Sequence, residues 1–379
     1  MRINENVLPV SVAADEREAK QAVSFKYIPA LDGLRGIAIV TVMIYHLEGL
    51  IPALHPYVKG GFLGVDIFFV LSGFLITSIL LKEYEKEGQI SLKNFYLRRF
   101  FRLVPAFWTF LIALYFFGNV ILPERQAEAI YNNNNFFFAF SYLMNWHSAT
   151  NDGLSGNLNH AWSLAIEEQF YILWSLILYK AFDEKRERKQ IFVFTSAMIL
   201  ILIALRAVRA LNGVDTNVLY YSTDTRIDAL LIGCAAAMIH TWRLLPRKLY
   251  ANRLFGVAVL ISLITALLVL FTFSHEDKFL YCGPLSVFSM SVGLAMLWLI
   301  TRKKSIVKRL LELRFLRWIG QISYGLYLWH YAFYEFGRKT FDAVPTQISV
   351  GLCLAFAVSA ISYYLIEKPF LKIKEKFGS

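Results

Sequence analysis

The chain has 379 residues and a formal net charge of +11, and 57% of its residues are hydrophobic while only 18% are charged. Soluble domains average about 45–50% apolar and about 25% charged residues, so this composition excludes a disordered chain, a collagen-like repeat and an ordinary soluble enzyme. It indicates a protein that crosses a membrane several times.

Ten segments are apolar over about the 20 residues that a helix needs to cross a bilayer. They cover residues 33–50, 62–81, 100–122, 160–180, 191–210, 226–242, 253–273, 283–301, 318–337 and 346–366. The run from Phe136 to Trp146 is apolar but too short to cross, and it predicts an interfacial or re-entrant helix. The predicted fold class is therefore all-α, a polytopic membrane protein with about ten transmembrane helices.

The basic residues predict the orientation of these helices. With a cytoplasmic N-terminus, 30 lysines and arginines fall in cytoplasmic segments and 8 in outer segments. This asymmetry follows the positive-inside rule, and we expect both termini in the cytoplasm. It also explains the surplus positive charge without nucleic-acid binding. The first 25 residues are polar and lack the apolar core of a signal peptide, so we expect them to form a cytoplasmic tail.

The first two predicted spans contain charged groups, which are costly in a membrane and usually functional. Arg35 and His46 in the first span are eleven residues apart, which on a helix is about 16.5 Å of rise and about three turns, so both face one side. Taken alone, Arg35 could be an anchor whose side chain extends to the membrane surface. Taken alone, His46 could form an interhelical hydrogen bond. The pair favours a function. Asp66, near the outer end of the second span, is explained equally simply by a helix cap or by pairing with an outer arginine.

The third span begins with a cluster of arginines at the inner surface, Arg98, Arg99 and Arg102. Anchoring to the cytoplasmic face explains any one of them. The cluster beside Arg35 also predicts a site for an anionic ligand, because a guanidinium group binds phosphate through two hydrogen bonds.

The fourth span enters from the outside and carries two adjacent carboxylates. Glu167 lies two helical turns deeper than His160 and on the same face. Glu167, Glu168 and Gln169 in succession inside a span are difficult to explain as anchors, so we expect a functional role there.

The later spans contain fewer polar groups. Arg226 at the start of the sixth span would be structural if it paired with Asp228 or Asp66. His330 lies among aromatic residues in the middle of the ninth span, where packing and a direct role explain it equally well. Four further histidines are in loops or at span ends and show no metal-ligand spacing, so we predict no metal; they are His55, His147, His240 and His275.

Five motifs together resemble the integral-membrane acyltransferase-3 family, which includes bacterial O-acetylases of surface polysaccharides and peptidoglycan. They are the Arg35-x10-His46 spacing, GVDIFFVLSGF at 64–74, RRFFRLVP at 98–105, WSL at 162–164 followed by EEQFY at 167–171, and SYGLYLWH at 323–330. The resemblance implies an O-acetyltransferase that transfers an acyl group, usually acetyl from acetyl-CoA, to a hydroxyl acceptor.

The resemblance extends over nearly the whole chain and suggests three parts. We expect a cytoplasmic tail at 1–30, a membrane acyltransferase domain at 31–368 and a second cytoplasmic tail at 369–379. Some family members carry an additional SGNH-type esterase domain. We expect this chain to act as a stand-alone member in the cytoplasmic (inner) membrane of a bacterium.

The resemblance and the spacing together predict how a donor would lie. CoA phosphates are expected on the cytoplasmic side, near Arg35, Arg98, Arg99 and Arg102. The rise from Arg35 to His46 is comparable to an extended pantetheine arm, so the thioester would reach the histidine.

On the outer side, His46 is expected to act as the general base that deprotonates the acceptor hydroxyl, because an unperturbed histidine titrates near neutral pH. Glu167 is the first candidate to orient its ring, as in a catalytic triad. The residues expected to contact a glycan or glycolipid acceptor are Asp66, His160, Trp162 and His330.

Two alternatives to an enzyme remain at the level of sequence. A transporter or flippase would also have buried charges, although no inverted repeat is evident. A non-catalytic scaffold on the same fold would leave the pair of Arg35 and His46 unexplained. The sequence predicts neither the acceptor, nor the choice between acetyl and succinyl, nor the oligomeric state.

Overall fold

The structure, a computed structural model, describes residues 27–117, 133–150, 156–302 and 305–374. These residues form helices and connecting turns without any strand, which confirms the all-α prediction for the described part of the chain. The predicted cytoplasmic tails at 1–30 and 369–379 lie largely or partly outside the described residues.

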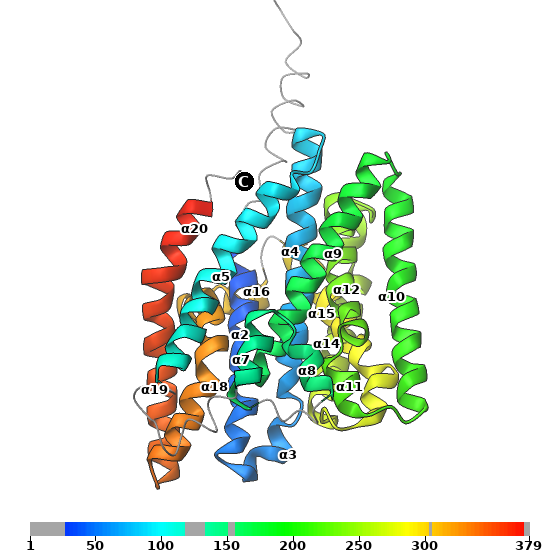
Figure 1. Ribbon diagram of the computed structural model, residues 1–379. Helices are drawn as coiled ribbons and strands as arrows, with labels where there is room; N and C mark the ends of the chain where they lie inside the picture. Colours follow the sequence, from blue (N-terminus) through cyan, green and yellow to red (C-terminus); the bar gives the residue numbers. More distant parts are fainter. Residues whose placement is uncertain (1–26, 118–132, 151–155, 303–304, 375–379) are drawn as a thin grey trace, which may run out of the picture.

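In the described part of the chain, ten helices of 18 residues or more correspond to the ten predicted spans and form one bundle (Figure 1). They are α2 (Pro29–His46), α4 (Gly64–Glu87), α5 (Leu92–Phe116), α9 (Trp162–Asp183), α10 (Arg188–Leu211), α12 (Thr223–Thr241), α14 (Arg253–Thr272), α15 (Pro284–Thr301), α18 (Ser323–Thr340) and α19 (Val344–Ser362).

Seven of these helices are long and apolar enough to cross a membrane. The other three, α9, α12 and α18, contain Glu167, Arg226 and His330 respectively, and they lie within the same bundle (Figure 1). The three helices whose composition is least typical of a membrane therefore each carry a charged or titratable residue within the bundle. This is the expected pattern when polar groups face the interior of a bundle and not lipid.

The long helices alternate in direction, so that connections gather at two ends (Figure 1). The turns between α4 and α5 and between α9 and α10 lie at the upper end, as does α20 (Lys368–Lys374). The short helices α3 (His55–Val58) and α11 (Thr216–Tyr221) and the turn between α18 and α19 lie at the lower end. The predicted cytoplasmic segments between α4 and α5 and between α9 and α10 are thus at the upper end, and the predicted outer segments named above are at the lower end, whereas α16 (Ile306–Leu311), also predicted to be cytoplasmic, lies at about mid-height (Figure 1).

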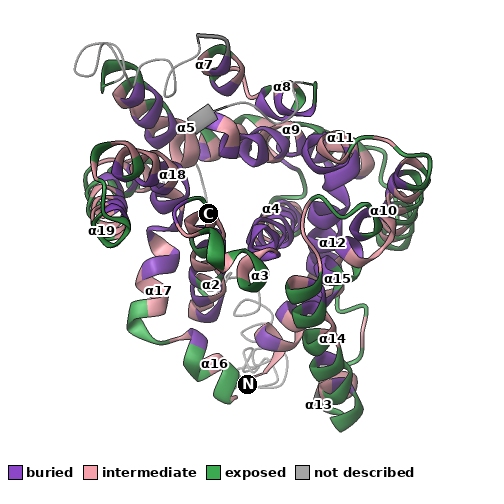
Figure 2. Cartoon of the chain, turned by 90° about the horizontal axis from the view of Figure 1, so that it is seen from below, coloured by how far each residue is buried: buried purple, intermediate pink, exposed green. Residues whose placement is uncertain are grey.

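Helix α4 lies at the centre and is buried on nearly all sides, whereas α10, α14 and α19 expose one face at the periphery (Figure 2). Close contact between α4 and α12 depends on two glycines. A Cβ atom at Gly73 would lie 1.9 Å from the carbonyl oxygen of Leu230, and one at Gly233 would lie 2.1 Å from that of Val70. Small residues are typical of such contacts because they let helix backbones approach closely in a membrane.

Two short helices, α7 (Asn133–Phe140) and α8 (Met144–Thr150), occupy the region where the sequence predicts an interfacial or re-entrant helix. Gln169 of α9 anchors them, because its side-chain amide donates to the carbonyl oxygen of Tyr142 and to Oδ1 of Asn145, each at 2.9 Å. Thr223 at the start of α12 donates to the Gln169 side-chain oxygen in turn. One of the three consecutive polar residues of the fourth span therefore has a structural role.

The remaining short helices are α13 (Arg247–Ala251), α16 (Ile306–Leu311) and α17 (Arg314–Gln321). Of these, α17 packs closely against the first half of α2, since a Cβ atom at Gly320 would lie 1.8 Å from the carbonyl oxygen of Asp32. This contact fixes the part of α2 that carries Arg35.

Candidate active site

Three pockets follow one another along α2. We call them the inner, middle and outer pockets, and their empty volumes, which include space open to solvent, are about 790, 630 and 750 Å³. The inner and middle pockets share Arg35 and Arg102, and the middle and outer pockets share Val65 and Tyr327. The pockets therefore form a row from the predicted cytoplasmic end of α2 to its outer end.

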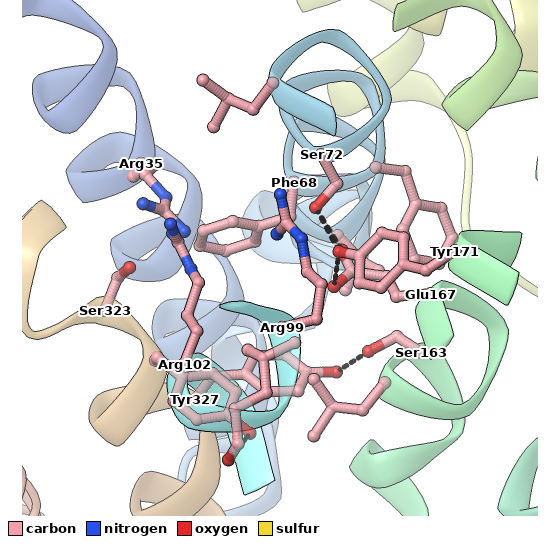
Figure 3. A pocket seen from close by; sticks show the side chains of 16 residues that line it. Arg35, Phe68, Ser72, Arg99, Arg102, Ser163, Glu167, Tyr171, Ser323 and Tyr327 are labelled. Carbon is pink, nitrogen blue, oxygen red and sulfur yellow. Dashed lines mark hydrogen bonds between the residues drawn. The ribbon is translucent and has the colours of Figure 1, made fainter. Parts of the chain in front are cut away.

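The middle pocket is positively charged. Arg35 of α2 and Arg99 and Arg102 of α5 line it, and the guanidinium groups of Arg35 and Arg102 point toward each other (Figure 3). The guanidinium carbon of Arg99 lies 5.2 Å from the centre of the Tyr171 ring. Glu167 is the acidic residue that lines this pocket. Three cations beside one carboxylate favour an anionic ligand.

The contacts of Glu167 place it in the middle pocket, among the arginines. Its carboxylate accepts hydrogen bonds from Ser72 Oγ and from the Tyr171 hydroxyl, both at 2.9 Å (Figure 3). Among the described residues, no hydrogen bond joins Glu167 to His46, which lines the outer pocket. The structure thus brings Glu167 to the arginines and not to the imidazole.

Arg98 lies apart from the other three arginines. It forms a 2.5 Å ion pair with Glu83, and both side chains are largely buried. Arg98 does not line the inner, middle or outer pocket. Neighbouring arginines on one helix turn can face different directions, and the sequence alone does not separate them.

The outer pocket brings together three residues predicted from the sequence, His46, His160 and Trp162. Most of the remaining lining is aromatic. It comes from α2, α11 and α18 and from the segments that precede α4 and α15. It comprises Tyr45, Phe62, Tyr220, Tyr221, His275, Tyr327 and Tyr331, and Asn159 adds an amide group. Aromatic faces with a few amide and hydroxyl groups suit a polar, uncharged ligand such as a sugar. Within the described part of the chain, no three His, Cys, Asp or Glu side chains are placed to hold a metal ion.

His275 and Tyr221 are among the titratable groups of this lining that lie outside the membrane-spanning helices. Burial lowers the pKa of His275, whose Nδ1 lies 3.1 Å from the Tyr45 hydroxyl, and burial raises the pKa of Tyr221. Both groups are therefore neutral near pH 7, and this part of the pocket offers hydrogen bonds without charge.

His330 lies behind His46 and is fully buried. Its Nε2 atom is 3.0 Å from Nδ1 of His46, and its own Nδ1 is 2.7 Å from the carbonyl oxygen of Leu326 one turn earlier in α18. His330 does not line the outer pocket itself. The two histidines come from helices that are far apart in the sequence and meet only in the folded bundle.

Asp66 is paired with Arg226 at 2.9 Å, and both side chains are buried. The guanidinium carbon of Arg226 lies 5.4 Å from the Trp162 ring centre and 5.0 Å from that of Tyr220. Asp66 is thus the partner of an outer arginine, one of the two structural explanations that the sequence offered. Asp66 thereby holds Arg226 against two aromatic residues of the outer pocket and so helps to fix the position of their rings.

Sequence reasoning did not identify Tyr327 as a site residue, although it separates the middle and outer pockets. Its hydroxyl lies 2.6 Å from Ser163 Oγ and donates to the carbonyl oxygen of His160 at 2.7 Å. Tyr327 belongs to the SYGLYLWH motif, which was the available signal. Tyr220 and Tyr221 in α11 had no comparable signal, because only tertiary packing brings this short helix to the pocket.

Comparison with known proteins gives a consistent result. Residues 28–366 match a family of integral-membrane proteins described as acyltransferase domain. The chain is 34% identical over 363 residues to a peptidoglycan O-acetyltransferase of Listeria monocytogenes, a match that covers 92% of this chain and 56% of the relative. It is 36% identical to a putative peptidoglycan O-acetyltransferase of Bacillus subtilis, and this match covers 91% of this chain and 55% of the relative.

A putative O-acetyltransferase of Staphylococcus aureus is 34% identical, and the match covers 92% of this chain and 58% of that protein. The chain therefore spans little more than half the length of these curated relatives. No solved structure matches the chain.

Proposed function

The chain belongs to the acyltransferase-3 family of integral-membrane proteins, and on this premise we propose that it is an O-acetyltransferase with a donor site and an acceptor site at opposite ends of α2. The donor is acetyl-CoA from the cytoplasm, and the acceptor is a hydroxyl group of an extracytoplasmic or lipid-linked glycan. The observation that supports this most strongly is the row of pockets, which is cationic in the middle and aromatic and hydroxyl-rich at the outer end. The names of two relatives, which specify peptidoglycan, favour a glycan acceptor.

On the donor side, Arg35, Arg99 and Arg102 bind the phosphate groups of CoA. Their guanidinium groups line the middle pocket, and two of them also line the inner pocket, which lies at the predicted cytoplasmic end. Glu167 holds Ser72 and Tyr171 at the wall of this pocket and balances part of the positive charge. Arg98, paired with Glu83, fixes α5 against the inner end of α4.

On the acceptor side, His46 is the general base. It takes the proton from the acceptor hydroxyl as that oxygen bonds to the acetyl carbonyl carbon, and the carbon–sulfur bond of the thioester breaks. His46 then returns the proton to the departing thiolate, so that no net charge remains on the protein. His160 and Trp162 hold the acceptor in the outer pocket, with Asp66 supporting Trp162 through Arg226.

The protein acts in the cytoplasmic membrane of a bacterium in this proposal. The apolar exposed faces of α10, α14 and α19 contact lipid (Figure 2), and the outer pocket lies at the end predicted to be extracytoplasmic. An acetyl group thus passes across the bilayer within one protein.

The test replaces His46 by Ala in cells that lack the chromosomal gene. We expect the base-labile acetyl esters on surface and lipid-linked glycans, measured by mass spectrometry, to fall to the level of the deletion, because removal of a general base lowers rates by about 10²–10⁴-fold. His240→Ala is the matched control, since His240 is at the inner end of α12 and lines none of the three pockets.

Normal ester levels with His46→Ala at normal abundance would refute the role of His46. Uptake or export of a glycan without any change in esters would favour a transporter instead.

A further inference from the structure

The two histidines at the outer pocket form a directed chain of hydrogen bonds. A carbonyl oxygen can only accept, so the 2.7 Å contact between Nδ1 of His330 and the Leu326 oxygen places a proton on that nitrogen. In a neutral ring, Nε2 of His330 is then an acceptor. The 3.0 Å contact with Nδ1 of His46 is therefore a bond that His46 donates. The proton of neutral His46 is on Nδ1, and its Nε2 carries the lone pair.

This tautomer is the one that a base in the outer pocket requires. His46 lines that pocket, and the hydrogen-bonding side chain among the described residues reaches its Nδ1 and not its Nε2, while the backbone carbonyl of Val42, one turn earlier in α2, also interacts with the ring. With Nδ1 held by His330, Nε2 is the nitrogen left to receive a proton from an acceptor hydroxyl. His46 is also the last residue of α2, where the C-terminal end of the helix dipole favours a positive charge.

Among the described residues around the two rings, no carboxylate takes the orienting role. Tyr45 and Tyr331 have ring centres 5.1 and 5.2 Å from that of His46, and His160 and Tyr334 have ring centres 5.9 and 5.8 Å from that of His330. The ring centre of Tyr327 is 6.1 Å from that of His330. Among the described residues, His330 is the side chain whose hydrogen bond fixes the imidazole of His46.

We propose that His330 is a positioning residue, which holds His46 in the Nδ1–H tautomer and shares the positive charge that forms on His46 during transfer. This proposal rests on the role of His46 in the proposed function. When Nε2 of His46 takes the acceptor proton, the Nδ1–H bond to His330 becomes charge-assisted and stronger. The backbone carbonyl of Leu326 fixes His330 in turn, so the orientation is set by the fold of α18. No proton is gained or lost over the whole cycle.

The experiment compares His330→Leu, His330→Gln and His330→Glu in purified protein in nanodiscs, with acetyl-CoA as donor and soluble peptidoglycan glycan strands as acceptor. Leucine fills a similar volume without a hydrogen bond, and we expect kcat to fall by about 100-fold, within the range found for acid–base groups, with the KM for acetyl-CoA unchanged. Glutamine can accept from His46 and donate to Leu326, so it should retain at least about a tenth of the activity.

Glutamate supplies a readout that packing alone would not change. A carboxylate beside Nδ1–H stabilises the imidazolium, so the acidic limb of the pH–rate profile should move to higher pH by about one unit relative to His330→Gln. Identical profiles for the Gln and Glu variants would overturn the proposal, and this comparison holds even if His330→Leu fails to fold. His240→Leu is the control for loss of a histidine elsewhere.

The outcomes also separate this inference from the proposed function. Inactive His46→Ala with fully active His330→Leu would refute only the role of His330. Active His46→Ala would refute the role of His46 and, with it, the positioning role of His330. Nitrogen-15 spectra of histidine-labelled protein, with His46→Ala used for assignment, should show His46 protonated on Nδ1 at high pH, and protonation on Nε2 would overturn the proposal without reference to activity.

Discussion

Arg35 links two of the three pockets, because it lines both the inner and the middle pocket, as does Arg102. Replacing it by Ala should raise the KM for acetyl-CoA by about 10–100-fold, since a hydrogen bond to a charged group contributes about 1.5–3 kcal/mol, while kcat changes little. Steady-state kinetics with varied donor concentration measures this. Arg338→Ala is the control, because Arg338 pairs with Glu335 at the outer end of α18. An unchanged KM would exclude the phosphate contact.

Asp66 and Arg226 form a buried ion pair, and their effect on stability should depend on whether one or both are changed. Asp66→Asn leaves a buried guanidinium group without its counter-charge, which typically costs about 3–5 kcal/mol, and thermal unfolding in detergent should occur at a clearly lower temperature. The double variant Asp66→Asn/Arg226→Gln should recover part of the loss. If Asp66→Asn instead unfolds like the unchanged protein but binds the acceptor weakly, Asp66 contacts the acceptor directly.

At the level of helices, the contact of α4 with α12 positions the wall that carries Ser72. Gly73→Ala would place a methyl group 1.9 Å from the Leu230 carbonyl oxygen, so the two helices must move apart. Overpacking of this kind costs about 1–3 kcal/mol or more, and we expect a lower unfolding temperature and reduced activity.

The matched control is Gly256→Ala in α14, where an added Cβ meets no atom within 4 Å. There the higher helix propensity of alanine should leave stability unchanged or raise it by up to about 1 kcal/mol. Equal unfolding temperatures for the two variants would contradict the packing seen between α4 and α12.

The whole molecule is organised as a bundle with two ends, which the distribution of charge predicts to be cytoplasmic and outer, and this predicts which residues a reagent can reach from outside. In a background with the three cysteines changed to Ser, Asp342→Cys in the turn between α18 and α19 should react with a membrane-impermeant maleimide in intact cells. Glu87→Cys at the end of α4 should react only after the membrane is made permeable. The physical reason for this expected difference in labelling is the positive-inside rule: loops rich in lysine and arginine, such as those at the upper end, are retained in the cytoplasm.

The two sites should exchange their accessibility if the orientation is opposite to the prediction. Labelling of both sites in intact cells would show that the end of α4 is not shielded by the bilayer, and would contradict the span predicted for this helix.

The sequence by itself determined the class of protein and the ten long helices, and it predicts their orientation. These depend on local properties, the length of apolar segments and the distribution of charge, which are visible without knowing how helices pack. It also placed Arg35 and His46 on one face of one helix, because their separation is fixed by helix geometry alone. The motifs along the chain carried the resemblance to the acyltransferase family, which the comparisons confirm.

Only the tertiary structure decided which polar groups meet. It paired His46 with His330 and grouped Glu167 with the arginines of the middle pocket, whereas sequence spacing had suggested Glu167 for His46. It also turned Arg98 toward Glu83 and away from its neighbours. A one-dimensional pattern gives the depth and face of a residue on its own helix. The rotation and tilt of neighbouring helices are set by the packing of the whole bundle, and they determine which face meets which.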